Sequence, residues 1–255
     1  MKTKVDVPKA MVLAPGRERS VLARHLWIFS GAVKKIHPEL QNGECVDVLS
    51  STGEFLARAF LNRSSSIIGR VLSFEQISPE EAIAGHLKRA LAFRKQLFGT
   101  VAGHLCRLVN AEADMLSGLV IDLYDTTAVL QISALGMERY KSCIVDVLRS
   151  SLPLTWIVEK STSPSRKKEG LAIETKTLWG EERKRIVVEE NGLKFSVNVV
   201  EGQKTGFFID QRETRDMVRR LSPGRRVLNC FSYSGAFSIA ALTSVFLVIR
   251  IPMAP

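Results

Sequence analysis

The feature that most constrains the fold is a hydrophobic strand that runs into a turn of small residues and then into a helix. RRVLNCF predicts a buried strand, SYSG a tight turn and AFSIAAL the next helix. This order is one unit of an α/β fold. A single unit cannot cover its own surfaces, because a parallel sheet needs strands on both sides and helices on both faces. The turn would let backbone N–H groups approach a ligand, although an ordinary tight turn has the same pattern.

The N-terminal residues 1–75 predict a compact β-rich module. Alternating apolar and polar residues surround turns at Asn42-Gly43 and Thr52-Gly53, which is typical of hairpins. IIGRVLSF predicts a further strand. Several short strands in so short a segment favour a small barrel or an open sheet.

A connector helix is expected over residues 76–100. Ser78 can cap it, Pro79 suits its first position, and Glu81 completes a capping box. The next part, residues 101–203, predicts a mixed α+β region. SGLVIDLYDTTAVLQIS contains two strands, MERYKSCIVDVLRSSL an amphipathic helix, TWIVEKS a strand, and RIVVEENGLKFSVNVV a hairpin with Asn-Gly at its tip.

Composition points to a basic globular protein. The chain of 255 residues carries 36 Lys and Arg against 26 Asp and Glu, a net charge of +10. This balance favours a polyanionic partner such as nucleic acid, while an anionic membrane or simple solubility would need the same charge. The 4 cysteines form no CxxC motif, so we expect free thiols in a reducing cytoplasm and no metal site. The first residues lack the apolar core of a secretory signal.

Four blocks then carry a resemblance that runs in register from Met11 to Leu242. They are GRERSVLARHLWIFSGAV, SRKKEG, QKTGFFIDQRETR and RVLNCFSYSGAFSIAAL. Together they resemble the bacterial 23S rRNA cytosine-C5 methyltransferases of the large-subunit type I family. The resemblance implies S-adenosylmethionine as methyl donor, 23S ribosomal RNA as partner, and a cysteine that adds to C6 of the base.

The resemblance also implies a multidomain α/β and α+β fold. We expect a PUA-like RNA-binding β barrel over residues 1–75 and the connector helix over 76–100. A central α+β domain would then span 101–203, and 204–255 would begin a Rossmann-like methyltransferase domain. The oligomeric state stays open, a dimer included.

Two sets of basic residues are the candidates for RNA contact. We expect Trp27 in the core. The positive charge beside it suits RNA phosphate contacts and stacking, and the alternative is that these basic residues form a solvated rim with no RNA contact. A basic loop after Pro164 is either a second contact or a plain exposed charge run. The candidates are Arg17, Arg19, Arg24, His25, Arg166, Lys167 and Lys168.

The donor site is expected where two of the resembling blocks meet. The first block offers Phe207, Asp210, Gln211 and Arg212, and the second offers Asn229, Phe231, Ser232 and Gly235. Asp210 would also suit as the cap of a helix whose inner face carries Met217 and Leu221. The arginines of that helix, Arg212, Arg215 and Arg219, would meet phosphates or pair with Asp216. Cys230 is expected to be a small filler in a buried strand, and no residue is assigned a catalytic role.

The last residues lack groups that the chemistry needs. No Asp or Glu follows Asp216, whereas donor sites of this fold use a carboxylate on the ribose hydroxyls. The family's Asp-Pro-Pro block and attacking cysteine are absent, and the resemblance departs around Thr243. Cytosine C5 needs a thiolate at C6, so we expect this chain to be a shortened product, inactive alone, with weak or absent donor binding.

Two other functions remain open on the sequence. A non-catalytic PUA-type protein would hold RNA without modifying it. A membrane-tethered protein would use residues 227–249, which are uncharged and long enough to cross a bilayer, although their serines and glycine dilute the hydrophobicity. We rank the membrane option last.

Overall fold

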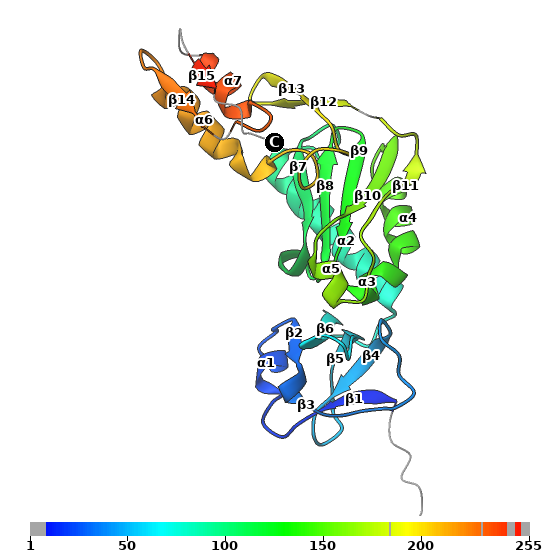
Figure 1. Cartoon of the computed structure of the whole chain (residues 1–255). Helices are drawn as coiled ribbons and strands as arrows, with labels where there is room; N and C mark the ends of the chain where they lie inside the picture. Colours follow the sequence, from blue (N-terminus) through cyan, green and yellow to red (C-terminus); the bar gives the residue numbers. More distant parts are fainter. Residues whose placement is uncertain (1–8, 184, 231, 244–247, 251–255) are drawn as a thin grey trace, which may run out of the picture.

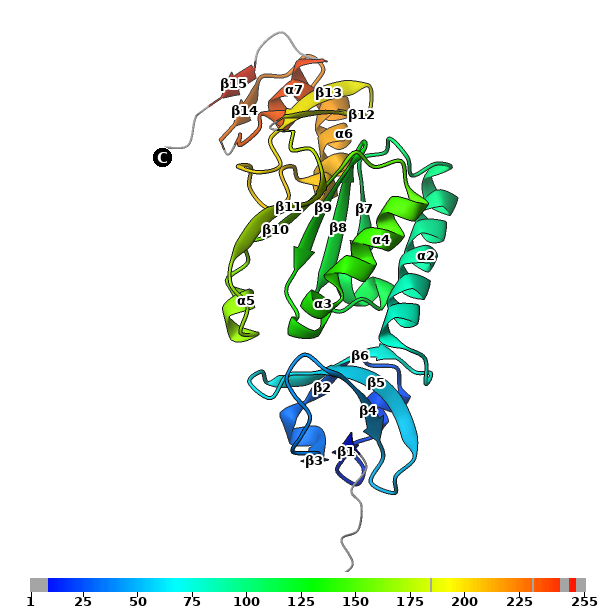
Figure 2. The same ribbon diagram turned by 90° about the vertical axis from the view of Figure 1, so that its right-hand side faces the viewer.

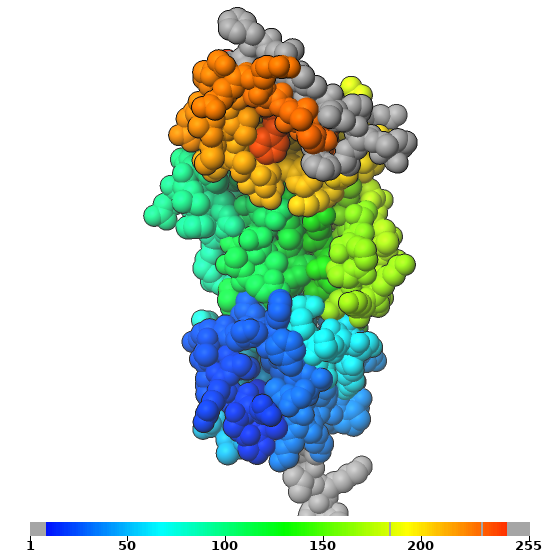
Figure 3. Space-filling view, turned by 60° about the vertical axis from the view of Figure 1, so that its left-hand side comes forward, coloured from blue at the N-terminus to red at the C-terminus, as the bar shows by residue number. Residues whose placement is uncertain are grey.

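The computed structural model describes residues 9–183, 185–230, 232–243 and 248–250. These residues form lobes that follow one another along the chain, with a waist between the N-terminal lobe and the middle one (Figure 1, Figure 3). The fold is mixed α/β, as the sequence predicted.

The N-terminal lobe is a curved sheet of six strands in the order β2-β6-β5-β4-β1-β3. The turn at Thr52-Gly53 joins the antiparallel strands β4 and β5, so this predicted hairpin is confirmed. The prediction of a hairpin at Asn42-Gly43 is wrong, because the strand before that turn, β3, pairs with β1 and not with β4. The elements are β1 (Ala10–Leu13), α1 (Arg19–Leu22), β2 (Trp27–Phe29), η1 (Ser30–Ala32), β3 (Val33–Ile36), β4 (Cys45–Leu49), β5 (Phe55–Leu61) and β6 (Ile67–Ser73).

The helix α2 (Pro79–Phe98) begins where the sequence predicted. The Ser78 side chain accepts a hydrogen bond from the Glu81 N–H at 3.1 Å, which satisfies one of the free donors of the first turn. Ile83 and Leu87 are fully buried in the core of the middle lobe. The helix therefore connects the lobes and also packs along the second of them.

The middle lobe is a five-stranded sheet in the order β11-β10-β9-β8-β7. The predicted strand pair across Asp125 is confirmed by β8 and β9, and β10 then joins β9 in parallel. The helices α2, α3 and α4 cover one face of this sheet (Figure 2). The elements are β7 (Cys106–Asn110), η2 (Ala111–Asp114), β8 (Leu119–Tyr124), β9 (Thr127–Ile132), α3 (Leu135–Arg139), α4 (Lys141–Ser151), β10 (Trp156–Ser161), α5 (Ser165–Lys168) and β11 (Glu174–Gly180).

A hairpin and an α/β unit form the C-terminal lobe. Asn191 and Gly192 have φ angles of 52° and 77°, the positive values that the hairpin turn requires, so the predicted hairpin is confirmed. The predicted strand, turn and helix are present, and β14 pairs in parallel with β15. The elements are β12 (Ile186–Glu190), β13 (Leu193–Val197), η3 (Ile209–Gln211), α6 (Arg212–Leu221), β14 (Val227–Asn229), α7 (Ala236–Leu242) and β15 (Val248–Arg250).

Three details of this lobe correct the sequence analysis. Leu228 of β14 is 58% exposed and Cys230 is exposed, because β15 is the one strand that pairs with β14 in the described chain. Met217 and Leu221 face outward on α6, whose buried side chain is instead Arg215. The Asp210 side chain does not cap α6, since a short 3-10 turn precedes that helix.

In the candidate membrane segment, residues 227–249, the described residues include β14, the helix α7 of 7 residues and the start of β15. In the described parts of the chain, no helix combines the length and the hydrophobicity that a bilayer crossing needs.

Candidate functional site

Two loops from different parts of the C-terminal lobe meet at the Tyr233 side chain. The Tyr233 hydroxyl accepts a hydrogen bond from the Gln203 N–H at 2.7 Å and donates one to the Gly206 carbonyl at 3.2 Å. Tyr233 has a φ of 40°, an uncommon value for a residue with a side chain. Gly202 lies so close to this hydroxyl that a Cβ there would sit 3.1 Å from it. The turn before α7 is thus tied to the loop of residues 202–206.

Phe208 presents its ring to the junction of the two loops. It meets the Tyr233 ring edge-on at a centroid distance of 5.3 Å. The Lys204 ammonium lies 4.6 Å from the Phe208 centroid, within the range of a cation–π contact. The junction therefore combines aromatic faces with a nearby positive charge.

A pocket of about 240 Å³ opens at this junction. We call it the junction pocket. Ligand pockets usually measure about 300–1,000 Å³, so this one is large enough for only part of a nucleoside-sized ligand. Its lining consists of Phe208, Gln211, Arg215, Ser232, Tyr233, Ser234, Ala236 and Phe237.

A buried polar network fixes the first of the two loops to the middle sheet. Asp122 is 1% exposed and accepts two hydrogen bonds from Arg107, at 2.8 and 3.0 Å. The Thr205 hydroxyl donates to Asp122, so the Tyr124 hydroxyl, 2.8 Å away, must be the donor toward Thr205. Burial, followed by the nearby Asp122 charge, raises the pKa of Tyr124, which keeps its hydroxyl protonated.

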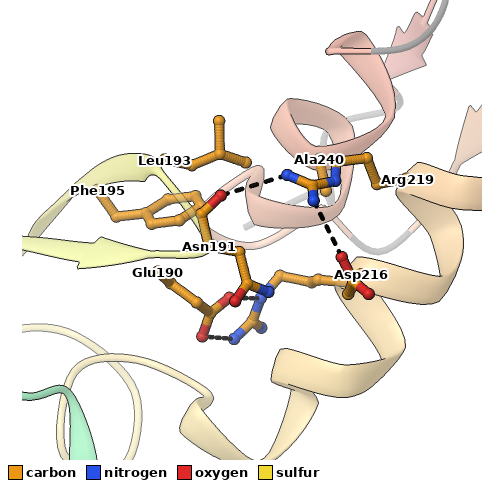
Figure 4. A pocket seen from close by; sticks show the side chains of 8 residues that line it. Glu190, Asn191, Leu193, Phe195, Asp216, Arg219 and Ala240 are labelled. Atoms are coloured by element: carbon orange, nitrogen blue, oxygen red, sulfur yellow. Dashed lines mark hydrogen bonds and ion pairs between the residues drawn. The ribbon is translucent and has the colours of Figure 1, made fainter.

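Arg212, Arg215 and Arg219 of α6 bind protein groups, whereas Arg220 of the same helix is largely exposed and pairs with Asp216. Arg215 makes hydrogen bonds of 2.6 and 2.7 Å to the Glu190 carboxylate of the hairpin, and Arg219 reaches the Asn191 carbonyl and Asp216 (Figure 4). The space between these groups is about 10 Å³, room for at most about one water molecule. The expected pairing with Asp216 is confirmed for Arg219, and the phosphate alternative has no support on this face.

The structure separates the predicted donor residues into groups. Gln211 and Ser232 line the junction pocket, and the N–H of Gly235 donates to the Ser232 carbonyl at 2.5 Å. Phe207 corrects our expectation, because it is 4% exposed and packs on Phe195, so that Phe208 faces the pocket in its place.

The other predicted donor residues lie outside the lining. Arg212 is a second correction, because its guanidinium is held by the Leu105 carbonyl and Glu190. Asp210 is exposed, and Asn229 donates to the Ser238 hydroxyl at 2.9 Å. Phe231 lies outside the described residues. The sequence analysis missed Phe208, Tyr233 and Phe237, although their place in the two quoted blocks was a signal for them.

The N-terminal RNA candidates are all on the surface. Arg24 and His25 line a groove of about 460 Å³ together with Trp27 of β2 and Glu112 of η2. Trp27 is half-buried and donates from its indole N–H to Glu112 at 2.8 Å, so it belongs partly to the interface between lobes and not to the core alone. Arg17 and Arg19 are exposed on and beside α1.

Arg166 contradicts the prediction of a basic loop. It lies on the short helix α5, is 2% exposed, and binds the Ile132 and Ala172 carbonyls. Its guanidinium also lies 3.3 Å from Glu138 and 3.5 Å from Glu159. A buried charge needs such partners, so Arg166 is structural, while Lys167 and Lys168 are exposed and stay candidates for RNA contact.

The carboxylates of Glu138, Glu159 and Glu174 lie within 4.8 Å of one another, a spacing that could suit a metal ion. Lys141 already joins all three, with its ammonium 2.6 Å from Glu159 and 3.3 Å from Glu174. Together with Arg166 and with Lys176, which lies 2.5 Å from Glu174, it balances the three negative charges, so this cluster is an ion-pair network.

The N-terminal and middle lobes are held together at Glu169. This buried carboxylate accepts hydrogen bonds of 2.8 Å from Arg70 and from Asn62, both in the N-terminal lobe. Burial acts to raise the pKa of Glu169, but the hydrogen bonds from Arg70 and Asn62 outweigh it and hold the pKa below its ordinary value. Nearby, Gly136 of α3 lies against Phe60, with no space for a Cβ between them.

Comparison with known proteins accounts for both ends of the chain. Residues 11–74 match the family of PUA-like domains, and residues 155–254 match the S-adenosylmethionine-dependent methyltransferases. The chain is thus similar to a PUA-like domain near its N-terminus and to an S-adenosylmethionine-dependent methyltransferase domain over its later part. The second match extends to residue 254.

The chain is 40% identical over 238 residues to proteins named ribosomal RNA large subunit methyltransferase I from Yersinia pseudotuberculosis and Yersinia pestis. The alignment covers 91% of this chain and 59% of each relative, so the chain spans about three fifths of their length.

Solved structures share the fold. A Streptococcus mutans protein described as an S-adenosylmethionine-dependent methyltransferase matches with a TM-score of 0.76. SMU.776, described as a methyltransferase complexed with SAH, matches with a TM-score of 0.78. Each is 22% identical, and each match covers 96% of this chain and 63% of the other. At this identity the likeness concerns the fold alone.

Proposed function

We propose that this chain supplies the RNA-binding lobes and the first part of the donor site of an S-adenosylmethionine-dependent methyltransferase acting on ribosomal RNA. The 40% identity to ribosomal RNA large subunit methyltransferase I along 91% of the chain supports the activity. The finer assignment, C5 of a cytosine in 23S RNA, rests on the resemblance of the four sequence blocks.

The observation that carries the donor assignment is the junction pocket. Its walls come from the KTGFFIDQR block and the SYSG turn, and Tyr233 ties the two together by hydrogen bonds on both sides of its hydroxyl. Such a pocket combines apolar faces with a few polar groups, which suits a small organic ligand. Its volume suits one end of the donor rather than the whole molecule.

Bound there, S-adenosylmethionine would supply an electrophilic methyl group on a positively charged sulfur. The chain's own residues would hold and orient it. The Phe208 and Tyr233 rings favour a cation nearby, while Gln211 and Ser232 offer hydrogen-bonding groups. Gly235 would keep the turn compact, because its φ of 74° is one that glycine adopts without strain.

We further propose that this chain alone does not transfer a methyl group. Among the described residues, those that line the junction pocket include no carboxylate that could bind ribose hydroxyls. The cysteine of the family's mechanism has no counterpart among the resembling blocks. Cys45 and Cys106 are poor substitutes, because burial raises the pKa of their thiols to about 12 and about 11.

The direct experiment measures three properties of the purified chain. Titration with S-adenosylmethionine in a calorimeter should give weak binding that Phe208→Ala removes. Binding of a 23S RNA fragment should fall steeply as salt rises. Incubation with labelled donor and RNA should leave the cytosines unmodified, and any C5 methylation of cytosine would refute the proposed inactivity.

A non-catalytic RNA-binding protein is the second candidate, favoured by the small volume of the junction pocket and its lack of acidic lining. The two functions differ in donor binding. RNA affinity with no heat from S-adenosylmethionine, under conditions where a full-length relative binds it, would favour the second. Donor binding that the Phe208 variant abolishes would favour the first.

A further inference from the structure

Three rings share one face of the N-terminal lobe at the start of β2. His25, Trp27 and Phe29 alternate with buried residues, since Ile28 between the last two is 1% exposed. Trp27 and Phe29 are alternate residues of β2 and point to the same side of the sheet, and the His25 ring, from the residues just before the strand, lies beside both of them. Phe29 is 49% exposed, an uncommon position for a ring that only packs.

The rings form an open slot with two walls and a floor, which we call the aromatic slot. The His25 and Phe29 rings are tilted by only 35° to each other, with centroids 6.5 Å apart. The Trp27 ring stands nearly perpendicular to both, at centroid distances of 6.1 and 6.3 Å. The wall spacing is roughly twice the ~3.4 Å rise between neighbouring bases of a nucleic-acid strand.

Two contacts fix the slot before any ligand arrives. The Trp27 N–H donates to Nδ1 of His25 at 3.2 Å, which sets the orientation of the imidazole. The Trp27 indole N–H donates to Glu112 of the middle lobe at 2.8 Å, so the floor of the slot is held from the other lobe. A site built in this way loses little rotamer freedom on binding.

We propose that the aromatic slot binds a single unpaired nucleobase of an RNA strand, between His25 and Phe29 and against Trp27. This inference rests on the proposed function, because it needs RNA as the partner. Unpaired bases stack on aromatic side chains, and every base offers a flat π face. Arg24 lines the same groove as His25 and Trp27, and the exposed Arg17 and Arg19 lie before and at the start of α1, which packs on β2; this positive charge suits the phosphates on either side of such a base.

Charge argues against an apolar peptide as the occupant. Arg24 lies over the Phe74 ring at 4.3 Å, at the edge of the same groove of about 460 Å³ that His25 and Trp27 line. The Glu112 carboxylate in this groove is already paired with the Trp27 indole N–H and with Arg70, so the groove offers a guanidinium, an imidazole and aromatic faces, which suit an anionic strand with flat bases better than a hydrophobic side chain.

The test uses the full chain and a short single-stranded RNA with 2-aminopurine at one position, whose fluorescence falls when the base stacks. We expect quenching with the unmodified protein and none with Phe29→Ala, together with about tenfold weaker binding. Phe29→Tyr, which retains the ring, should preserve both. Leu22→Ala is the matched control, since Leu22 is 66% exposed on the adjacent α1 and carries no aromatic ring.

The salt dependence separates stacking from charge. We consider the slope of the logarithm of the binding constant against the logarithm of the salt concentration. Its magnitude should be unchanged in Phe29→Ala and should decrease by about one in Arg19→Ala, which removes a phosphate contact. Binding and quenching unchanged in both Phe29→Ala and His25→Ala would overturn the slot while leaving RNA binding intact. An unmodified chain that binds no RNA would instead overturn the proposed function.

Discussion

The Thr205 hydroxyl donates a hydrogen bond to the Asp122 carboxylate at 2.7 Å, although the two residues are 83 positions apart in the sequence. Thr205 belongs to the KTGFF segment beside the junction pocket, and Asp122 lies on β8 of the middle sheet. Because the carboxylate is also bound by Arg107, the middle lobe holds the loop that forms one wall of the pocket.

Replacing Thr205 by valine keeps the shape of the side chain and removes its hydrogen bonds. Asp122 then keeps Arg107, but the Tyr124 hydroxyl loses its acceptor at 2.8 Å and keeps only the longer contact to the Phe207 carbonyl, at 3.4 Å. We expect a loss of about 1–3 kcal/mol in the free energy of unfolding, measured by urea denaturation. Thr175→Val on the exposed face of β11 is the control and should change stability by less than about 0.5 kcal/mol. Equal losses in both variants would contradict the role of the network.

Replacing Tyr233 by phenylalanine removes the hydroxyl that ties the two loops. The ring still meets Phe208, but Gln203 and Gly206 lose their partner. We expect about a tenfold loss of donor affinity, read by calorimetry, since one neutral hydrogen bond contributes about 0.5–1.5 kcal/mol. Tyr140→Phe removes a hydroxyl near Phe60, away from the pocket, and should leave donor affinity unchanged. A normal affinity in the Tyr233 variant would show that the tie does not shape the pocket.

Gly136→Ala should disturb the contact between the N-terminal and middle lobes. A Cβ at this position would lie 2.1 Å from Cγ of Phe60, so either the ring or α3 must move. We expect a loss of about 1–3 kcal/mol, measured as a lower denaturation midpoint. Gly31 has open space around its Cβ position and no positive φ, so Gly31→Ala serves as the control. A Gly136 variant as stable as the Gly31 variant would count against a tight interface.

Arg166→Ala should reduce stability without a specific effect on RNA binding. It leaves Glu159, which is fully buried, with Lys141 as its remaining ion-pair partner. Breaking a buried pair from one side typically costs about 3–5 kcal/mol. Lys168→Ala, two residues along the same short helix, should leave stability within about 0.5 kcal/mol. A folded Arg166 variant that loses RNA affinity, while the Lys168 variant does not, would restore the original assignment of this residue to RNA.

Stability should depend on pH through Glu169. Its pKa is held below the ordinary value of 4.5 in the folded chain by Arg70 and Asn62, against the opposing effect of burial. A carboxyl with a lowered pKa stabilises the fold above its unfolded pKa, and that contribution is lost as the pH falls through the folded pKa. Urea denaturation at about pH 7 and about pH 4 should therefore show a smaller difference for Glu169→Gln than for the unmodified chain. The same pH dependence of stability in both proteins would show that a group other than Glu169 is responsible for it.

Local rules in the sequence predicted much of the fold. The Asn191-Gly192 turn needs positive φ at both residues, and the Ser78 cap satisfies a donor three residues away, so both could be predicted without tertiary information. The exposed edge strand β11 was missed, since few of its side chains are buried and its alternation is weak.

The candidate site was less predictable because its geometry depends on distant partners. Phe207 and Phe208 are neighbours, and only the packing of Phe207 on Phe195 decides which ring faces the pocket. The burial of Arg166 also depends on distant partners. Its ion-pair partners Glu138 and Glu159 lie in other elements, so no local sequence pattern could predict the pairing. Residue types were thus easier to predict than the direction in which each side chain points.

The hydrogen bonds of Glu169 and the close packing of Gly136 on Phe60 join the N-terminal lobe to the middle one at adjacent points of one interface, since Glu169 also accepts a hydrogen bond from the Leu135 N–H. The Thr205 hydrogen bond to Asp122 attaches the loop of the junction pocket to the same middle lobe, so the distance between the aromatic slot and the junction pocket is set by the protein. An RNA strand that reached both the aromatic slot and the junction pocket would have to span this fixed distance with a fixed length of its backbone. The nucleotide that reaches the junction pocket would then be selected partly by its distance along the strand from the base in the aromatic slot.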